Sequence, residues 1–400
     1  MRRDRDNVPE DALRARKQLL EWLIGKACPL WSTYDVDRER GGFHERLNGT
    51  TGLDEPRRAR VPPRQVCAFA ISATLGWSGD AAKLATHGIL YFLTHYRRPD
   101  GLFRTLVAPE GMPIDNRALL YDQAFVLLGL AEGQRVLGPR AELVDEARRL
   151  RAAIYRDLKR KGPGFESGLP SDQPLSANAH MHLFEAAQAW IPISDDPEWH
   201  ALANEIADLA LSRFIDISTG AVRELFTPGW SPLPGAPGRI IEPGHHFEWA
   251  WLLLRWAGTA HTETRNAALR LMQIGELHGV RNDIVINALL DDFSVHDASA
   301  RLWPQTERIK AAVLAARLTG EPRYWTMATT AANTLLRYLD TPVAGSWYDR
   351  LMPNDEFVEE PAPASSFYHI AAAIMELSAA SGSTAALSRP KDRGDEGGIR

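Results

Sequence analysis

The segment Glu242-Pro-Gly-His-His-Phe-Glu-Trp-Ala-Trp251 combines groups that can transfer protons with groups that can bind a sugar. A proline and a glycine interrupt the backbone, so a helix is expected to begin there with two histidines in its first turn. His245 and Glu248 are three residues apart, which puts them on one helical face. Histidine can exchange a proton near neutral pH, and an indole such as Trp249 can stack on a sugar ring. Taken alone, the segment also fits a capped helix whose histidines bind local polar groups.

Two further histidines occupy comparable places in apolar segments. His182 lies three residues before Glu185, and His369 follows Tyr368 at the start of the last apolar run. A single histidine in an apolar helix usually satisfies a local polar group, but three near the starts of different buried helices can converge on one pocket. The sequence therefore predicts a shared proton-transfer site that contains His182, His245 and His369.

Other polar and aromatic side chains lie near the starts of the same apolar segments. Such a pocket can hold several hydroxyls through hydrogen bonds and one face of a sugar against an indole ring. For Arg301 and Glu307, an ordinary ion pair across a helix start is the alternative. The expected substrate-binding residues are Arg64, His182, Asp122, Tyr121, Trp303, Glu307, Arg301 and Trp249.

A glycine followed by an apolar residue recurs at intervals of about sixty residues, which predicts a repeated unit. Between these turns, nearly all-apolar helical segments alternate with amphipathic ones, so each unit should hold one buried and one water-facing helix. Six such pairs would close into an all-α (α/α)6 barrel of about twelve helices, with the turns as hairpin-like loops at one rim. An open superhelical array is the alternative. The glycines are Gly42, Gly101, Gly164, Gly220 and Gly345, and Asn282 stands near the place of the missing turn.

The ends of the chain differ from its middle. Residues 1–10 and 381–400 are polar and charged and are expected to be frayed or disordered, which leaves 11–380 as a single catalytic barrel. Residues 47–60, with glycine, proline and arginines, indicate a long rim loop. Buried helices are expected over 118–133, 178–190, 247–256 and 366–379, and water-facing helices over 141–158 and 199–214.

Composition excludes several classes of partner. Of 400 residues, 44% are apolar and 24% charged, and the formal charge is −5, so nothing favours nucleic acid or an anionic membrane. The sequence shows neither a run of membrane-spanning length nor an apolar segment typical of a signal peptide, and Cys28 and Cys67 make no disulfide framework. A cytoplasmic protein without metal or other cofactor is expected. Its partner would be a small sugar, with a homodimer left open as the assembly.

Six motifs together resemble one family. RVPPRQ, LLYDQAF, NAHMHLFEA, EPGHHFEWAWLL, RLWPQTERIKA and the final FYH are similar to the N-acylglucosamine 2-epimerase superfamily, which includes cellobiose 2-epimerases and mannose isomerases. The similarity covers about residues 20–380, and the motifs occur in the family's order. It implies an (α/α)6 barrel, no metal, and proton transfer next to a sugar carbonyl.

The resemblance also implies roles for individual residues. His245 and His369 would be the acid/base pair, and His182 and Arg64 would bind substrate oxygens. Glu248 would orient His245 or the anomeric hydroxyl.

One position departs from the family pattern. The chain has Gln123 after Asp122, where relatives often have histidine. The change is expected to alter a side chain near the pocket, so the choice of substrate cannot be transferred from the family.

The chemistry favours an enzyme that moves a proton next to a carbonyl. Return of the C2 proton to C1 of a cis-enediolate gives a ketose, and return to C2 from the opposite face gives an epimer. We expect an aldose–ketose isomerase of the mannose/fructose type. The alternatives are an N-acyl-D-glucosamine 2-epimerase, a mannose 6-phosphate/fructose 6-phosphate isomerase, an (α/α)6 glycosidase, which needs two opposed carboxylates, and a sugar-binding protein without catalysis.

Overall fold

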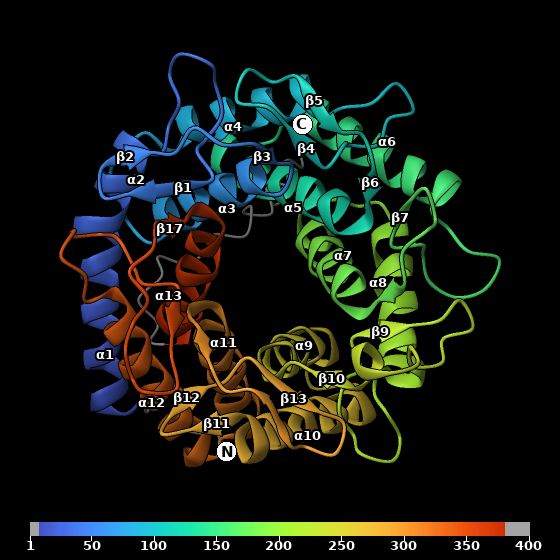
Figure 1. The fold of residues 1–400 in the computed structure, drawn as a ribbon, viewed down its shortest axis with the longest axis vertical. Coiled ribbons are helices and arrows are strands. Elements are labelled where there is room, and N and C mark those ends of the chain that lie inside the picture. The colour runs from blue at the N-terminus through green and yellow to red at the C-terminus, as the bar shows by residue number, and fades with distance from the viewer. Residues whose placement is uncertain (1–7, 381–400) are drawn as a thin grey trace, which may run out of the picture.

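The computed structural model describes residues 8–380, which form two concentric rings of helices (Figure 1). Of the two predicted tails, 381–400 and most of 1–10 lie outside the described residues. The inner helices are α3 (Val61–Thr74), α5 (Leu120–Leu137), α7 (Ala177–Trp190), α9 (Pro243–Ala257), α11 (Leu302–Thr319) and α13 (Phe367–Ala380). The outer helices are α1 (Glu10–Trp22), α4 (Ala81–His95), α6 (Ala141–Asp157), α8 (Glu198–Leu209), α10 (Thr262–Gly279) and α12 (Pro322–Leu339). The predicted (α/α)6 barrel is confirmed.

The two rings differ because their sequences bury different fractions of the helix surface. In α5 nearly every residue from Leu120 to Gln134 is buried, in keeping with a sequence that is apolar on almost all sides. In α6 the buried residues include Leu143, Ala147, Leu150 and Ile154, which recur every three or four positions and face the inner ring. Neighbouring inner helices contact one another, and α13 contacts both α11 and α3, so the ring is closed.

The first and last units join through aromatic packing. Helix α1 continues through a π-helical turn (Leu23–Ala27) into α2 (Cys28–Tyr34). The Trp31 ring stacks on Trp347 with centroids 4.3 Å apart, and its indole N–H donates to the carbonyl of Gly345 at 3.1 Å. A Cβ at Gly345 would lie 2.5 Å from the carbonyl oxygen of Lys26, so only glycine fits this junction.

The predicted glycine turns are hairpin turns at one rim. Gly42, Gly101, Gly164, Gly220 and Gly345 all have positive φ, and the turn between β11 (Val280–Arg281) and β12 (Ile284–Val285) uses Asn282 and Asp283 in the same region. Antiparallel bridges close four of the glycine turns, namely Val36 to Phe43, Arg97 to Phe103, Lys159 to Phe165 and Ile215 to Val222.

Short strands connect the hairpins around this rim. The strand that precedes each inner helix pairs with a strand from a neighbouring unit. The pairing of β17 (Ala362–Pro363) with β1 (Arg46–Asn48) joins the last unit to the first. Residues 47–60, which were predicted to form a rim loop, lie at this rim but also contain β2 (Thr51–Gly52), β3 (Arg57–Arg58) and most of β1. The other strands are β4 (Leu106–Val107), β5 (Pro113–Asp115), β6 (Ala118–Leu119), β7 (Gly168–Leu169), β8 (Leu175–Ser176), β9 (Leu225–Phe226), β10 (Ile240–Ile241), β13 (Ala288–Leu290), β14 (Val295–Asp297), β15 (Ala300–Arg301) and β16 (Arg350–Leu351).

Each inner helix begins at the rim that carries these strands. The predicted helix 118–133 starts two residues late, as α5, because Ala118 and Leu119 form β6. The predicted helix 199–214 is α8 followed by a π-helical turn (Ala210–Phe214), and short 3-10 turns cover Ile191–Ile193, Ala236–Arg239 and Ala364–Ser366. No helix within residues 8–380 combines the length and the apolar character that crossing a membrane would require.

Candidate active site

A cavity of about 960 Å³ opens at the rim where the inner helices begin. Its lining comes from all six inner units, because the first turns of these helices converge on the barrel axis (Figure 1). The predicted site residues that line it are Arg64, Tyr121, His182, His245, Glu248, Arg301, Trp303 and His369. The predicted site residues that do not line it are Asp122, Trp249 and Glu307.

His369 projects from the first turn of α13 and is held by a carboxylate from α11. Its Nδ1 lies 2.8 Å from Glu307 Oε1, and if this carboxylate is ionised, Nδ1 donates and Nε2 is the unprotonated nitrogen. Burial, with help from the cations Arg64 and Lys310, lowers the pKa of His369 well below its usual value. A neutral imidazole with a free nitrogen can accept a proton, so His369 is built as a base.

His245 lies in the first turn of α9 and faces acidic side chains. Its Nδ1 is 2.9 Å from Glu224 Oε2 and 3.9 Å from Glu242 Oε2. Burial alone would lower the pKa of His245, but these two carboxylates outweigh it and raise the pKa to about 10. The ring is therefore an imidazolium at neutral pH and can donate a proton.

The carboxylate that orients His245 is not the one suggested by helical spacing. Glu248, three residues after His245, was expected to orient that ring or the anomeric hydroxyl, and the hydrogen-bond partner of the ring is Glu224. Glu224 lies beside β9, in the segment after the Gly220 turn, and nothing in its distance along the chain from His245 indicates the contact. A partner on a different element leaves no helical periodicity to read.

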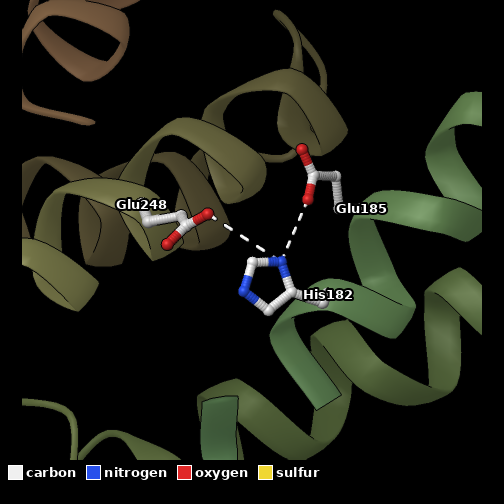
Figure 2. Close-up of side chains that lie close together, drawn as sticks. All are labelled: His182, Glu185 and Glu248. Carbon is white, nitrogen blue, oxygen red and sulfur yellow. Dashed lines mark hydrogen bonds and ion pairs between the residues drawn. The ribbon is translucent and has the colours of Figure 1, made fainter. Parts of the chain in front are cut away.

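Glu248 instead lies close to His182, which also contacts Glu185 (Figure 2). His182 Nδ1 lies 3.1 Å from Glu185 Oε2 and 3.9 Å from Glu248 Oε1. Burial lowers the pKa of His182 to about 4, although Glu185 opposes the shift. Burial also raises the pKa of Glu248 well above its usual value, and its Oε1 has no hydrogen-bond partner within residues 8–380. An uncharged carboxyl at this place can donate a hydrogen bond to a sugar oxygen.

Arg64 brings a positive charge to the cavity without a carboxylate partner among the described residues. Its guanidinium donates to the carbonyl of Ser365 at 3.3 Å and to the Tyr121 hydroxyl at 2.5 Å. It also lies over the Phe125 ring, 4.0 Å from the centroid. Because aromatic rings and neutral oxygens hold it, its charge stays available for an oxyanion.

Trp303 lies beside both the cationic His245 and the neutral His369. Its ring centroid is 5.1 Å from that of His245 and 5.8 Å from that of His369, and Arg301 lies over the same ring. Gly244 makes room for the indole, since a Cβ there would meet the ring at 2.5 Å. The indole can therefore support one face of a sugar placed between the two imidazoles.

Three residues predicted to bind substrate have other surroundings. Trp249 is buried in the core, where it packs against Phe184 and Phe214. Asp122 is buried behind the lining and binds Arg60 at 3.1 Å and the Thr105 hydroxyl. Glu307 lies behind His369, and Lys310 is its second partner at 2.7 Å.

A repeated contact fastens four inner helices to their hairpin turns. The side chain of Gln123 accepts a hydrogen bond from the backbone amide of Phe103. It also donates one to the backbone carbonyl of Leu119, four residues earlier at the start of its own helix. The other three repeat this pattern: His180 contacts Phe165 and Ser176, His246 contacts Val222 and Glu242, and Gln305 contacts Val285 and Arg301.

This contact corrects one expectation. Gln123 was expected to alter a side chain near the pocket, but it is fully buried, away from the lining, and bonded to backbone. Glutamine at position 123 accepts the same backbone hydrogen bond that histidine accepts at positions 180 and 246. The replacement of histidine by glutamine therefore lies in the scaffold and does not alter the cavity lining.

Three groups within residues 8–380 bring ligand atoms close enough to hold a metal ion. They are His182 with Glu185 and Glu248, His245 with Glu224 and Glu242, and His369 with Glu248 and Glu307. Sequence spacing does not indicate them, because each group combines residues from separate elements. In each group the histidine Nδ1 already contacts a carboxylate.

Comparison with known proteins identifies the family. A profile of the N-acylglucosamine 2-epimerase (GlcNAc 2-epimerase) family matches residues 41–373. The chain is 47% identical over 373 residues, covering 90% of it and 96% of the relative, to a mannose-6-phosphate isomerase of Rhizobium meliloti (strain 1021). Its fold is similar to a solved cellobiose 2-epimerase from Spirochaeta thermophila DSM 6192 (TM-score 0.82, 20% identity, 93% of this chain and 97% of that one) and to a solved D-mannose isomerase (TM-score 0.82, 22% identity, 90% and 97%). The chain therefore belongs to the N-acylglucosamine 2-epimerase family and is an enzyme of the sugar isomerase and epimerase class.

Proposed function

We propose that the protein interconverts an aldose and a ketose of the mannose/fructose type through a cis-enediolate. The observation that carries this proposal is the pair His369 and His245, which face one cavity with their pKa values shifted in opposite directions. Proton transfer next to a carbonyl needs a base for the C–H bond and a donor for the oxygen that becomes negative. The two rings supply these two functions at the same pH.

In the proposed reaction, Nε2 of the neutral His369 takes the proton from C2 of the open-chain aldose. The C2–H electron pair forms the C1=C2 bond, and the carbonyl electrons move to O1, which the His245 imidazolium and Arg64 stabilise. The proton then passes from His369 to C1 on the same face, while the His245 imidazolium gives its proton to O1 and takes up the proton that O2 releases as the C2 carbonyl forms, which gives the ketose. Glu248, as an uncharged acid, donates to the anomeric oxygen during ring opening.

The charge balance of the cavity favours an unphosphorylated sugar. Six arginines line it, but five have carboxylate partners, and Arg64 is the exception. The pairs are Arg46–Glu55, Arg58–Glu45, Arg60–Asp122, Arg301–Glu242 and Arg350–Glu360. A phosphate would need an arginine that is free of such a partner, and the proposed reaction already uses Arg64 at O1. The name of the Rhizobium relative points to mannose 6-phosphate instead, so this second substrate has to be tested beside the first.

A panel of sugars followed by NMR tests the proposal. Mannose, mannose 6-phosphate and N-acetylglucosamine are each incubated with the enzyme in D2O, and C2-deuterated mannose is incubated in H2O. We expect fructose from mannose, part of the deuterium at C1, and a lower kcat/KM for the phosphate. The control is His369→Ala, whose kcat should fall by about 10²–10⁴-fold.

Two outcomes would overturn the first choice. N-acetylglucosamine giving N-acetylmannosamine with complete loss of the C2 proton, and no ketose from mannose, would establish the epimerase. A higher kcat/KM for mannose 6-phosphate would establish the phosphorylated substrate and contradict the charge argument.

We also propose that catalysis needs no metal ion. An ion in any of the three candidate groups would compete with the carboxylate contact at the histidine Nδ1, and beside Glu307 it would meet the ammonium of Lys310. We expect kcat to stay unchanged after exhaustive dialysis against EDTA and after addition of Mg²⁺, Mn²⁺ or Zn²⁺. A loss of activity that a divalent ion restores would contradict the metal-free reaction.

A cytoplasmic location belongs to the same proposal. Cys28 and Cys67 are both free and buried, and a protein without disulfides suits a reducing compartment. A homodimer stays a prediction, which sedimentation velocity tests.

A further inference from the structure

A lysine is buried below the active site, where the proposed reaction gives it no direct role. Lys310 lies on α11, one turn after Glu307, and its side chain has no exposed surface. Its Nζ is 2.7 Å from Glu307 Oε2 and 3.8 Å from the centroid of the Trp251 ring. A buried ammonium is costly unless opposite charge compensates it, so its position points to a specific partner.

Glu307 connects this lysine to the base of the reaction. One carboxylate oxygen faces Lys310, and the other lies 2.8 Å from His369 Nδ1. The three groups thus form a line from the ammonium through the carboxylate to the imidazole. Among residues 8–380, Lys310 is the only lysine or arginine within ion-pair distance of Glu307.

We propose that Lys310 is a positioning residue that keeps Glu307 ionised and thereby holds His369 in the tautomer with its proton on Nδ1. The inference rests on the proposed role of His369 as the base, and it adds a residue that does not touch the substrate. The ionised carboxylate can only accept a hydrogen bond, so Nδ1 must carry the proton and Nε2 must be free. A protonated Glu307 could instead donate to Nδ1, which would move the ring proton to Nε2 and remove the base.

Burial alone would favour that inactive arrangement. Glu307 has no exposed surface, and burial raises its pKa, while Lys310 provides the largest opposing effect. The pKa of Lys310 is itself raised, because the nearby carboxylates outweigh the effect of its burial. The other titratable and charged groups that face this pair are Glu185 and His182 on α7, Glu248 on α9, Tyr368 and His369 on α13, and Arg64 on α3.

These neighbours do not replace the lysine. Glu185 stays ionised, since His182 and Lys310 hold its pKa at about 2, and it therefore disfavours a second charge on Glu307. Arg64 is held at the cavity by Ser365 and Tyr121, away from the carboxylate. Loss of the ammonium would leave Glu307 as an uncompensated buried charge, which takes up a proton.

The test compares Lys310→Met with a matched control. Arg151→Met also removes a buried cation that has one carboxylate partner, Asp196, and one aromatic partner, Trp199, but it lies on α6 outside the cavity. Kinetics are measured on the sugar that the wild type converts, and the ring tautomer is read from the ¹⁵N spectrum of histidine-labelled protein. The His369 signals are assigned by their loss in His369→Ala.

We expect Lys310→Met to lower kcat by about 10–100-fold, less than the loss of His369 itself, with KM within about twofold, because the base is misprotonated but not removed. The His369 ring should change from the Nδ1–H to the Nε2–H pattern. Arg151→Met should keep the wild-type kcat and tautomer, even if it unfolds at a lower temperature.

Several results would overturn the proposal. A Lys310→Met enzyme with wild-type kcat, or with a lower kcat and an unchanged His369 tautomer, would give the lysine a purely structural role. If this variant does not fold, Lys310→Gln takes its place in the same measurements. The wild-type spectrum is a further test, because a wild-type His369 with its proton on Nε2 excludes the proposed role of Lys310. The spectrum needs no substrate, so this inference can fail or succeed independently of the proposed sugar chemistry.

Discussion

At the scale of single residues, the proposed acid His245 and the proposed base His369 are the same residue type and differ only in their neighbours. His245 faces Glu224 and Glu242, which stabilise its imidazolium. His369 shares its carboxylate with Lys310 and is close to Arg64, which favours its neutral form together with burial. An acid and a base must hold opposite protonation states at one pH, and different partners produce this from one residue type.

Glu224→Gln tests how this division arises. The pKa of His245 is raised to about 10 by its carboxylates, so the imidazolium should persist through neutral pH and be lost only at alkaline pH. Removing the charge of Glu224 lowers that pKa, so we expect the alkaline limb of kcat/KM to move toward neutral pH by about one unit or more. The measurement is the pH dependence of kcat/KM from pH 6 to 11.

Glu55→Gln provides the control for this change. Glu55 lines the same cavity and binds Arg46, so the variant removes an equal charge without touching either histidine. Its alkaline limb should match the wild type. An unchanged limb in Glu224→Gln would show that Glu224 does not set the charge of His245.

The sequence identifies cavity-lining residues at helix starts more readily than it identifies the side chains that contact them. His245 and His369 stand out because each begins an apolar segment, and both line the cavity. Trp249 lies in the core and not on the cavity, and a helix that is apolar all round does not reveal in its sequence which face is turned toward the axis. Glu224 could not be assigned, because its contact with His245 depends on how separate elements pack. Lys310 follows Glu307 by three residues on one helix, but this spacing does not show that the pair is buried behind His369.

At the scale of elements, the start of each inner helix fixes the site. The four contacts of Gln123, His180, His246 and Gln305 connect a helix start to the hairpin turn of the preceding outer helix. His245, next to one of these residues, is thereby held at a defined height on the barrel axis. The site therefore depends on side chains whose hydrogen bonds go to backbone.

The helices could be predicted from the sequence, but the strands could not. Periodicity and apolar runs locate segments such as 141–158, which the structure shows as α6 (Ala141–Asp157). Strands of two or three residues are too short to show an alternating pattern, and their pairing joins units distant in the chain, as β17 with β1. The glycine turns still indicated where the hairpins lie, because a positive φ favours glycine.

At the scale of the whole molecule, the barrel contains buried histidines that are neutral only above a certain pH. Burial lowers the pKa of His180 and of His246 to about 4, and both rings must be neutral at Nε2 to accept the backbone amide. In the unfolded chain a histidine has a pKa of about 6.5. The unfolded state therefore binds protons first as pH falls, so stability present above about pH 6.5 is lost as pH falls toward 4.

The double variant His180→Gln/His246→Gln should resist this loss. Glutamine makes the same two contacts at positions 123 and 305 and does not titrate, so we expect stability near wild type at pH 7.5. Between pH 7.5 and 4.5 the variant should lose less unfolding free energy than the wild type, by roughly 2–3 kcal/mol for each histidine. Urea unfolding at both pH values measures this difference. His261→Gln, which replaces an exposed ring, should behave as the wild type. If the double variant loses as much unfolding free energy as the wild type, His180 and His246 do not set the acid stability of the barrel.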